Sequence, residues 1–239
     1  MAAQDNIEKN LLRIRQKIAQ ACQRKRRDAR DVTLVAVTKS APIEAIARLV
    51  DLGVNDLGES RVQQLVERAE ELAPKLATLP ADRRVRWHMI GHLQRNKIKP
   101  VLDAGVEVIH SVDSLRLAED LNERAEKMGK KLDLMIQVNC SQEPQKFGVA
   151  VGAATYLAEM ISTLKHVRMI GLMTMGPLVA DPEEARPTFG RLRELFEDMR
   201  RDGFGGPDFR HLSMGMSQDY EVAVEEGATI VRIGTALFE

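Results

Sequence analysis

The feature that most restricts how this chain can fold is an alternation of strand-like and helix-like segments over nearly all of its 239 residues. Short apolar or β-branched runs, typical of buried strands, alternate with stretches whose apolar residues recur at helical spacing. Strands are predicted at 33–38, 54–57, 86–90, 106–110, 132–139, 167–173, 209–213 and 229–233. Helices between consecutive strands produce right-handed units and a parallel sheet, so the pattern predicts an α/β fold.

A helix is expected before the first strand, with Ile7, Leu11 and Ile18 on one face. Further helices are predicted within 42–50, 59–73, 93–103, 113–129, 153–164, 181–199 and 220–226. Asp113 and Asp181 are expected to cap two of them, and residues 74–84 to form a loop. Only six residues follow the last predicted strand, so we expect the N-terminal helix to cover the gap left by an incomplete eighth helix.

Eight such units in this length favour a closed (β/α)8 TIM barrel forming a single domain over residues 1–239. The alternative is an open, doubly wound sheet. A sheet of that kind usually carries a G-x-G-x-x-G turn after its first strand to bind a dinucleotide, and this sequence has none there. The closed barrel is therefore the preferred architecture.

Composition excludes several classes of function. The 35 basic residues balance the 35 acidic ones and aromatic residues make up only 4%, so nothing favours nucleic-acid binding. The basic run at 24–30 is interpreted as helix-end cations. No segment resembles a signal peptide or a membrane span, and the two cysteines lack metal-ligand spacing. We expect a cytoplasmic, monomeric protein without a metal site.

In a TIM barrel the functional residues lie at the carboxyl ends of the strands. Here those ends bring Lys39 together with two glycine-containing turns, Ser213–Ser217 and Gly234-Thr235. The turns after the seventh and eighth strands form the usual phosphate site of such barrels, because backbone amides and hydroxyls converge there. The alternative is that glycine and serine only shape the loops.

Arg232 interrupts the last apolar strand, and a buried guanidinium requires a partner. The partner is either an acid of a neighbouring strand, such as Glu107, or a ligand in the barrel mouth. A lysine, an arginine and a phosphate cup together indicate a phosphorylated aldehyde held as an imine, since a neutral amine is nucleophilic. Standing alone, Lys39 would be interpreted as a surface lysine.

Other polar residues near the strand ends remain open. His88, His110 and His211 are either proton carriers or hydrogen-bonded structural histidines, and the latter is preferred. Asn139 and Met173 are candidates for contact with a ligand, although core packing or loop capping explains them equally well. Cys140 borders the same rim without a neighbouring cation in the sequence to activate it.

Seven segments in collinear order resemble the pyridoxal-phosphate homeostasis proteins, which are similar to the barrel domain of fold-type III enzymes such as alanine racemase. These segments are LVAVTKSAP, LGESRVQQL, RWHMIGHLQRNK, IHSVDS, MIQVNCSQEPQKFG, GLMTM and LSMGMSQDYEVAVEEGATIVRIGTALF. The resemblance implies a fold-type III barrel with pyridoxal 5'-phosphate, a vitamin B6 form, as cofactor.

The resemblance also implies residue roles. Lys39 matches the lysine that forms the internal aldimine, and Arg232 matches the arginine facing the pyridine nitrogen. The phosphate-binding segments correspond to Ser213, Gly215, Ser217, Gly234 and Thr235. The family motif G-E-N reads Gly58-Glu59-Ser60 here, so a serine stands where an asparagine is expected near the cofactor.

The function implied is reversible binding of pyridoxal phosphate in cofactor and amino-acid homeostasis, with apo-enzymes as recipients and no substantial catalysis. The alternative is an amino-acid racemase, which needs a second base opposite the lysine. The chain's tyrosines are Tyr156, within a predicted helix, and Tyr220, just after the phosphate turn. Tyr220 keeps this alternative open, although packing on the seventh helix explains it. A lysine-dependent aldolase is a third possibility, but its reaction would not require the arginine at position 232.

Overall fold

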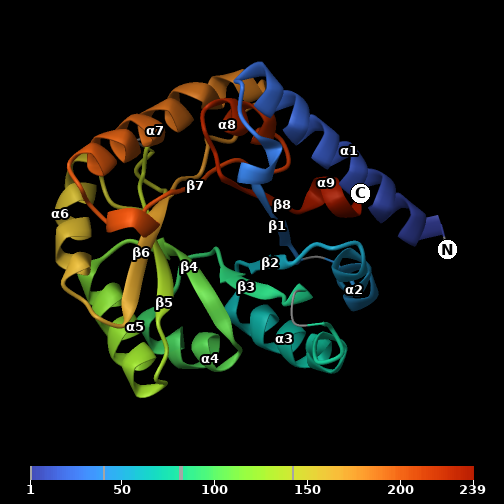
Figure 1. Cartoon of the computed structure of the whole chain (residues 1–239), viewed down its shortest axis with the longest axis horizontal. Coiled ribbons are helices and arrows are strands. Elements are labelled where there is room, and N and C mark those ends of the chain that lie inside the picture. Colours follow the sequence, from blue (N-terminus) through green and yellow to red (C-terminus); the bar gives the residue numbers. More distant parts are fainter. Residues whose placement is uncertain (1, 40, 81–82, 142) are drawn as a thin grey trace.

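The computed structural model describes residues 2–39, 41–80, 83–141 and 143–239, and in it eight parallel strands close into a barrel (Figure 1). The strands follow one another in sequence order, and the last pairs with the first. They are β1 (Thr33–Val37), β2 (Asp56–Glu59), β3 (Arg86–Met89), β4 (Val106–Val112), β5 (Leu132–Gln137), β6 (Val167–Met173), β7 (His211–Ser213) and β8 (Ile230–Ile233). The predicted TIM barrel is confirmed.

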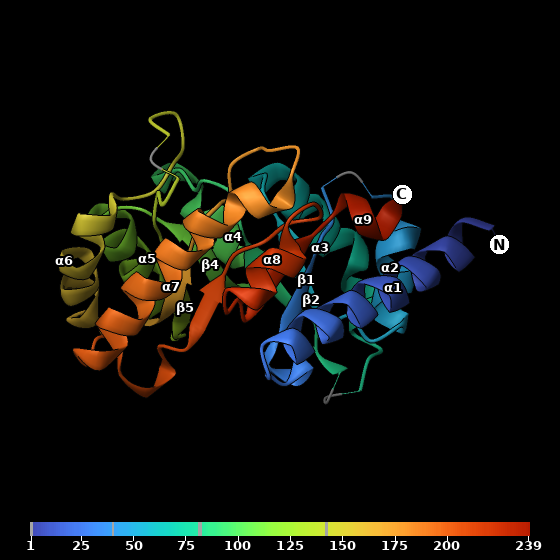
Figure 2. The same ribbon diagram turned by 90° about the horizontal axis from the view of Figure 1, so that it is seen from above.

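Helices surround the barrel in chain order (Figure 1). They are α1 (Ala2–Arg24), α2 (Ile43–Asp51), α3 (Val62–Leu76), α4 (Ile98–Asp103), α5 (Leu115–Lys127), α6 (Val151–Ser162), α7 (Arg186–Arg201), α8 (Tyr220–Glu225) and α9 (Thr235–Phe238). Figure 2 shows the barrel from the side, with the loops after β5 and β6 at one end and the turn before β7 at the other. We call the end where the strands finish the mouth and the other end the base.

The strands separate two apolar regions. One large core fills the space between the strands and the helices, and a small cluster lies apart from it. The small cluster consists of Val35, Val108, Met135, Ile170, Met173 and Ile230. Because side chains alternate between the faces of a strand, His110 lies on the same face as Val108, and Arg232 on the same face as Ile230. The barrel interior therefore combines a small apolar layer with buried polar groups.

The N-terminal helix α1 covers the side of the barrel near α8 and α9, as the short C-terminal segment led us to expect (Figure 1). Asn10 donates a hydrogen bond to the Leu237 carbonyl oxygen at 3.2 Å. Lys17 Nζ forms an ion pair with Glu221 at 2.7 Å. These contacts hold the first and last helices together.

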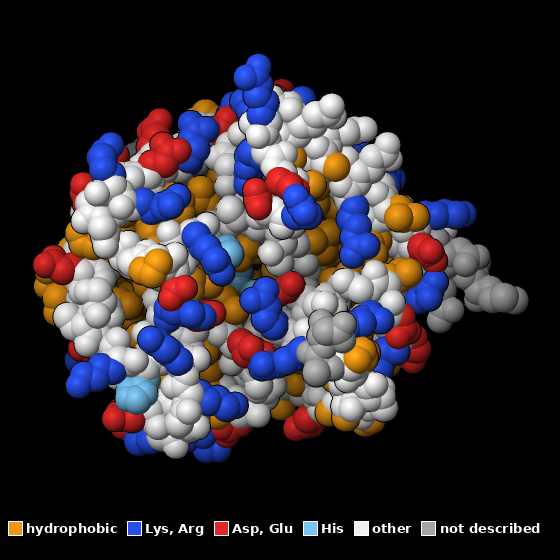
Figure 3. All heavy atoms as spheres, viewed as in Figure 1, with side chains coloured by type: hydrophobic (Ala, Val, Ile, Leu, Met, Phe, Trp, Pro, Cys, Tyr) orange, Lys and Arg blue, Asp and Glu red, His pale blue; other side chains and the backbone are white. Residues whose placement is uncertain are grey.

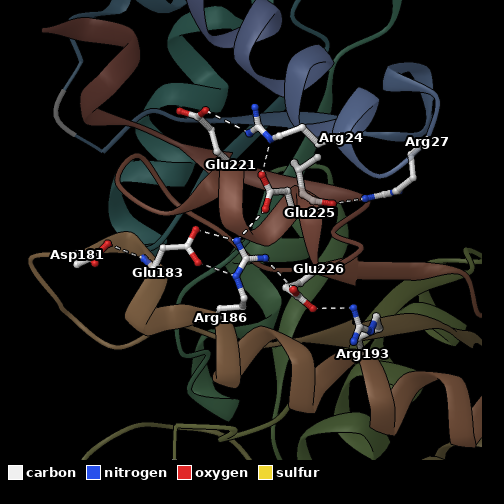
Figure 4. A network of polar contacts seen from close by, with 10 residues as sticks. Arg24, Arg27, Asp181, Glu183, Arg186, Arg193, Glu221, Glu225 and Glu226 are labelled. Carbon is white, nitrogen blue, oxygen red and sulfur yellow. Dashed lines mark hydrogen bonds and ion pairs between the residues drawn. The ribbon is translucent and has the colours of Figure 1, made fainter.

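The basic run after α1 contributes to the same interface. Arg24 pairs with Glu225 at 2.6 Å, and Arg27 donates to the carbonyl oxygens of Val224 and Ala228. Figure 4 shows these contacts joined to those of Arg186, whose guanidinium binds carboxylates of three residues. They are Glu183, Glu225 and Glu226. The run therefore binds the protein's own helices.

Several predicted boundaries were wrong. Pro74 lies inside α3, which runs to Leu76 because Leu72 and Leu76 still pack on the core. Ser114, and not Asp113, caps α5, since its hydroxyl oxygen accepts a hydrogen bond from the Leu117 amide.

Two other helix starts begin with tight turns. Asp181 caps a 3-10 turn (Pro182–Ala185) that precedes α7. The helix predicted from 93 begins as a 3-10 turn over Arg95–Lys97 before α4. None of the helices in the described part of the chain has the length and apolar character that a membrane span requires.

Candidate functional site

Lys39 follows β1 at the mouth of the barrel, and its side chain is exposed. The backbone on both sides of it is anchored. Thr38 donates its hydroxyl to Glu59 Oε1 at 2.5 Å, and the Ala41 amide donates to the Thr38 carbonyl at 3.0 Å. Arg68 of α3 binds the Ala41 carbonyl at 2.7 Å. No hydrogen bond or ion pair from the described residues engages the Lys39 amine, so the loop is held while the amine remains available.

Glu59 contacts the end of β1 just before Lys39. Its carboxylate is fully buried, and burial raises its pKa against the Thr38 hydrogen bond and the charges of Arg68 and Lys39. Arg68 Nε lies 3.0 Å from the same oxygen that Thr38 binds. Glu59 Oε2 has no hydrogen-bond partner in the described structure. The strand end is therefore fastened to α3 by a buried carboxylate close to the lysine.

Arg232 is only 3% exposed and is held by neutral acceptors. Its Nη1 donates to Ser213 Oγ at 2.6 Å and its Nη2 to the Thr174 carbonyl at 2.9 Å. Burial lowers the pKa of Arg232 to about 10, against the effect of the Asp219 charge, so it remains a cation at neutral pH. Within the described residues no carboxylate forms an ion pair with it. A buried cation without an anion is costly, and this position is suited to a polar ligand.

The suggested ion pair between Arg232 and Glu107 is wrong. Glu107 instead pairs with Arg84 at 2.7 Å. Glu107 is the second residue of β4, at the base, whereas Arg232 is the third of the four residues of β8. The two residues therefore belong to different levels of the barrel.

The turns after β7 and β8 meet, as predicted. Ser217 Oγ accepts hydrogen bonds from the backbone amides of Gly234 at 3.2 Å and Ala236 at 3.3 Å. Gly215 has φ +94°, and a Cβ there would lie 2.5 Å from the Ala223 Cβ, so glycine is required. Thr235 is exposed at the start of α9. Two backbone amides and a hydroxyl, groups that can donate to an anion, therefore lie close together between the two turns.

Ser213 differs from the other predicted phosphate residues. Its hydroxyl oxygen is fully buried, lies 2.8 Å from His110 Nδ1, and accepts from Arg232. The structure therefore joins Ser213 to the arginine inside the barrel. His110, for which a hydrogen-bonded structural role was preferred over that of a proton carrier, is completely buried and lies within hydrogen-bond distance of His88 and Ser213.

A pocket of about 220 Å³ opens between the loops after β5 and β6, and sequence reasoning did not assign it. Its lining includes Lys146 and Phe147, with Thr174, whose carbonyl also holds Arg232. Lys146 Nζ is engaged by the Gly176 carbonyl at 2.9 Å and by Glu143. The segment QKFG was noticed in the sequence, but only the folded chain brings it beside Thr174.

The remaining candidates lie close to this mouth in structural roles. Asn139 donates its amide to the carbonyls of Glu143 and Lys146 and so shapes its own loop. Met173 belongs to the small interior cluster. Cys140 is buried, and burial raises the pKa of its thiol to about 11, so the thiolate is disfavoured.

Tyr220 is packed rather than open to the mouth. It is 5% exposed, begins α8 and belongs to the main apolar core. Burial and the neighbouring Glu221 raise the pKa of its phenol to about 12, against the charge of Arg13 in α1. Tyr156 is 66% exposed on α6. Across the described parts of the chain, no cluster of three or more histidine, cysteine, aspartate or glutamate side chains is arranged to hold a metal ion.

Comparison with known proteins agrees with this geometry. Residues 4–239 match the family model of the alanine racemase N-terminal domain. A pyridoxal phosphate homeostasis protein of Aquifex aeolicus is 40% identical over 233 residues, which cover 98% of this chain and 97% of the relative. The Escherichia coli protein of the same name is 34% identical over 234 residues, covering 98% and 96%.

Solved structures give the same result. PipY of Synechococcus elongatus, solved with pyridoxal phosphate bound, is 32% identical with a TM-score of 0.77, covering 93% of this chain and 100% of PipY. An alanine racemase of Clostridium difficile shares the fold with a TM-score of 0.70 at 15% identity, covering 98% of this chain but 56% of the racemase. The chain therefore belongs to the alanine racemase N-terminal domain family, and within it to the pyridoxal phosphate homeostasis proteins.

Proposed function

We propose that this protein binds pyridoxal 5'-phosphate at the barrel mouth, covalently on Lys39, and serves cofactor and amino-acid homeostasis without substantial catalysis. The observation that carries the proposal is the mouth itself. Among the described residues, it combines an exposed lysine amine without a hydrogen-bond or ion-pair partner, a buried arginine without an anionic partner, and a turn whose amides donate to Ser217. These features match an aldehyde, a pyridine nitrogen and a phosphate, respectively.

The residues fit this ligand in charge and in shape. Ser217, Gly234 and the Ala236 amide would bind the phosphate, with Gly215 allowing the turn and Thr235 beside it. Ser213 would act through Arg232, because its hydroxyl is already engaged inside the barrel. When bound, the ligand supplies an aldehyde carbon that condenses with a primary amine, releasing water and leaving a Schiff base.

Arg232 supports the proposed lack of substantial turnover. A permanent cation beside the pyridine nitrogen opposes protonation of that nitrogen, which weakens the ring as an electron acceptor. The buried phenol of Tyr220 provides no second base at the mouth, so no observation on the described residues favours the racemase alternative. The free cysteines, both buried and reduced, are consistent with a cytoplasmic location.

The test is an absorption titration of the purified protein with pyridoxal phosphate, with pyridoxal as the matched ligand that lacks the phosphate. We expect a saturable imine band with one ligand per chain and much weaker binding of pyridoxal. The same sample, incubated with L- and D-amino acids, should show no exchange of the α-proton above background. Equal affinity for the two aldehydes would contradict the assignment of the phosphate site. Rapid exchange of the α-proton would favour the racemase alternative.

A further inference from the structure

A continuous row of hydrogen bonds crosses the barrel interior from the base to Arg232. At the base, Asp56 Oδ1 lies 2.9 Å from His88 Nε2, and His88 Nδ1 lies 2.9 Å from His110 Nε2. His110 Nδ1 then lies 2.8 Å from Ser213 Oγ, which is 2.6 Å from Arg232 Nη1. We call these five residues the relay. They come from β2, β3, β4, β7 and β8, so only the closed barrel brings them together.

The two ends of the relay determine where its hydrogens lie. A guanidinium can only donate and an ionised carboxylate can only accept. Both ends are satisfied if each of the three groups between them donates once and accepts once. In that arrangement the Ser213 hydroxyl donates to His110 Nδ1, and each histidine carries a single hydrogen, on Nε2.

The charges around the relay support this assignment. Burial lowers the pKa of His110 well below its usual value, and the permanent charges of Arg232 and Arg86 act in the same direction. Burial raises the pKa of Asp56, but the His88 hydrogen bond and the charge of Arg86 outweigh it and leave that pKa below the usual value. These shifts favour an ionised Asp56 carboxylate and a neutral His110 imidazole.

Through the relay, the Asp56 carboxylate at the base determines the orientation of the Ser213 hydroxyl at the mouth. Asp56 fixes the His88 tautomer, His88 fixes that of His110, and His110 takes the Ser213 hydrogen. The Ser213 lone pair is then directed to Arg232, whose Nη2 is held by the Thr174 carbonyl.

We propose that Asp56 is a positioning residue for Arg232, acting through His88, His110 and Ser213. The proposal extends the proposed function, because it assumes that the guanidinium so positioned faces the bound cofactor. Figure 3, which views the base, shows charged side chains gathered around the middle of this face. Asp56 and Arg86 keep part of their surface in solvent there, with side chains 14% and 46% exposed.

The first test uses the ligand-free protein and ¹⁵N NMR of its histidine rings. We expect His88 and His110 to be neutral Nε2–H tautomers near pH 7. Asp56→Asn keeps an acceptor oxygen and should preserve both tautomers, whereas Asp56→Leu, of similar shape, should change the His110 signals. His211→Asn is the matched control, since His211 contacts Thr229 and lies outside the relay. An Nδ1–H tautomer or an imidazolium at His110 in the unaltered protein would overturn the proposal, with no variant required.

The second test adds pyridoxal phosphate and follows the visible band against pH. Asp56→Leu should shift the midpoint of this titration by at least half a pH unit, while Asp56→Asn and His211→Asn should not. A folded Asp56→Leu protein with wild-type tautomers and an unshifted midpoint would show that Asp56 is only structural. If no band forms on Lys39, the proposed function fails while the tautomer result still stands by itself.

Discussion

Charged side chains at the base of the barrel form ion pairs, whereas two cations at the mouth have no ion-pair partner among the described residues. At the base, Asp56 pairs with Arg86 and Asp133 with Arg168, each at 2.7 Å. At the mouth, Arg232 is buried against neutral acceptors, and the Lys39 amine is unpaired within the described structure. Partly exposed ion pairs of the base type contribute about 0–1 kcal/mol each. A buried cation without an anion has no such compensation, and we therefore propose that the base maintains the fold whereas the mouth binds the anionic ligand.

The largest expected effect follows from removing the mouth lysine. Lys39→Ala should abolish the imine band and the borohydride-stable adduct, while the protein remains folded, because the other described amine near the mouth, Lys146, is engaged by Gly176 and Glu143. The phosphate cup should still retain some ligand without a covalent bond. Absorption spectra and intact mass after reduction measure this, and Lys99→Ala, an exposed lysine paired with Asp103, is the control. An unchanged adduct in the Lys39→Ala protein would contradict the assignment.

Removing the mouth arginine should weaken binding substantially. Arg232→Met deletes a charged hydrogen-bonding group worth about 1.5–3 kcal/mol, so affinity for pyridoxal phosphate should fall about 10- to 100-fold. Arg168→Met, at the base, should leave affinity within about twofold, since its partners are Asp133 and Asp208. Equal losses in the two variants, measured by equilibrium titration, would remove the distinction between the two ends.

The base should instead make the fold sensitive to acid. Burial, with the charges of Arg210 and Arg86, lowers the pKa of His211 to about 4, against the effect of Asp133. Between that value and about 6.5 the unfolded chain binds more protons than the native one, so the free energy of unfolding falls as pH falls through this window. In the His211→Asn protein, the free energy of unfolding should fall by about 1–3 kcal/mol less over this window. The expected difference is smaller than the full pKa shift implies, because the ring is only half-buried. Urea unfolding at pH 7.5 and 4.5 measures it, and parallel pH profiles for the two proteins would refute the assignment.

The smallest effect is expected at the phosphate turn. Ser217→Ala removes one hydroxyl that receives two amides, worth about 1 kcal/mol, so pyridoxal phosphate should bind about fivefold more weakly. Binding of pyridoxal should be unchanged. Ser162→Ala, at the exposed end of α6, is the matched control. A similar loss for both aldehydes would place Ser217 outside the phosphate site.

The order of elements could be predicted because apolar periodicity is a local signal. The positions of Lys39, Gly215, Ser217 and Gly234 at strand ends followed from the same pattern. Helix ends were harder to predict from the sequence. Pro74 stays within α3 because packing of the neighbouring leucines outweighs one lost backbone hydrogen bond.

Contacts between side chains of different strands could not be predicted, because they depend on the register of strand pairing. The pairing of His88 with His110 arises from the shifted register between β3 and β4, which no local pattern contains. The partner of Arg232 was misjudged for the same reason, since Glu107 lies at another level of the barrel. Thr174 was missed because it contributes only its backbone carbonyl, which every residue type has.

The most direct test of the central claim is a peptide map of the protein after saturation with pyridoxal phosphate and reduction with borohydride. We expect one modified peptide, the one that contains Lys39, with the surface lysines unmodified. Label spread over several lysines, or concentrated on Lys146, would contradict the claim that the mouth holds its ligand on Lys39.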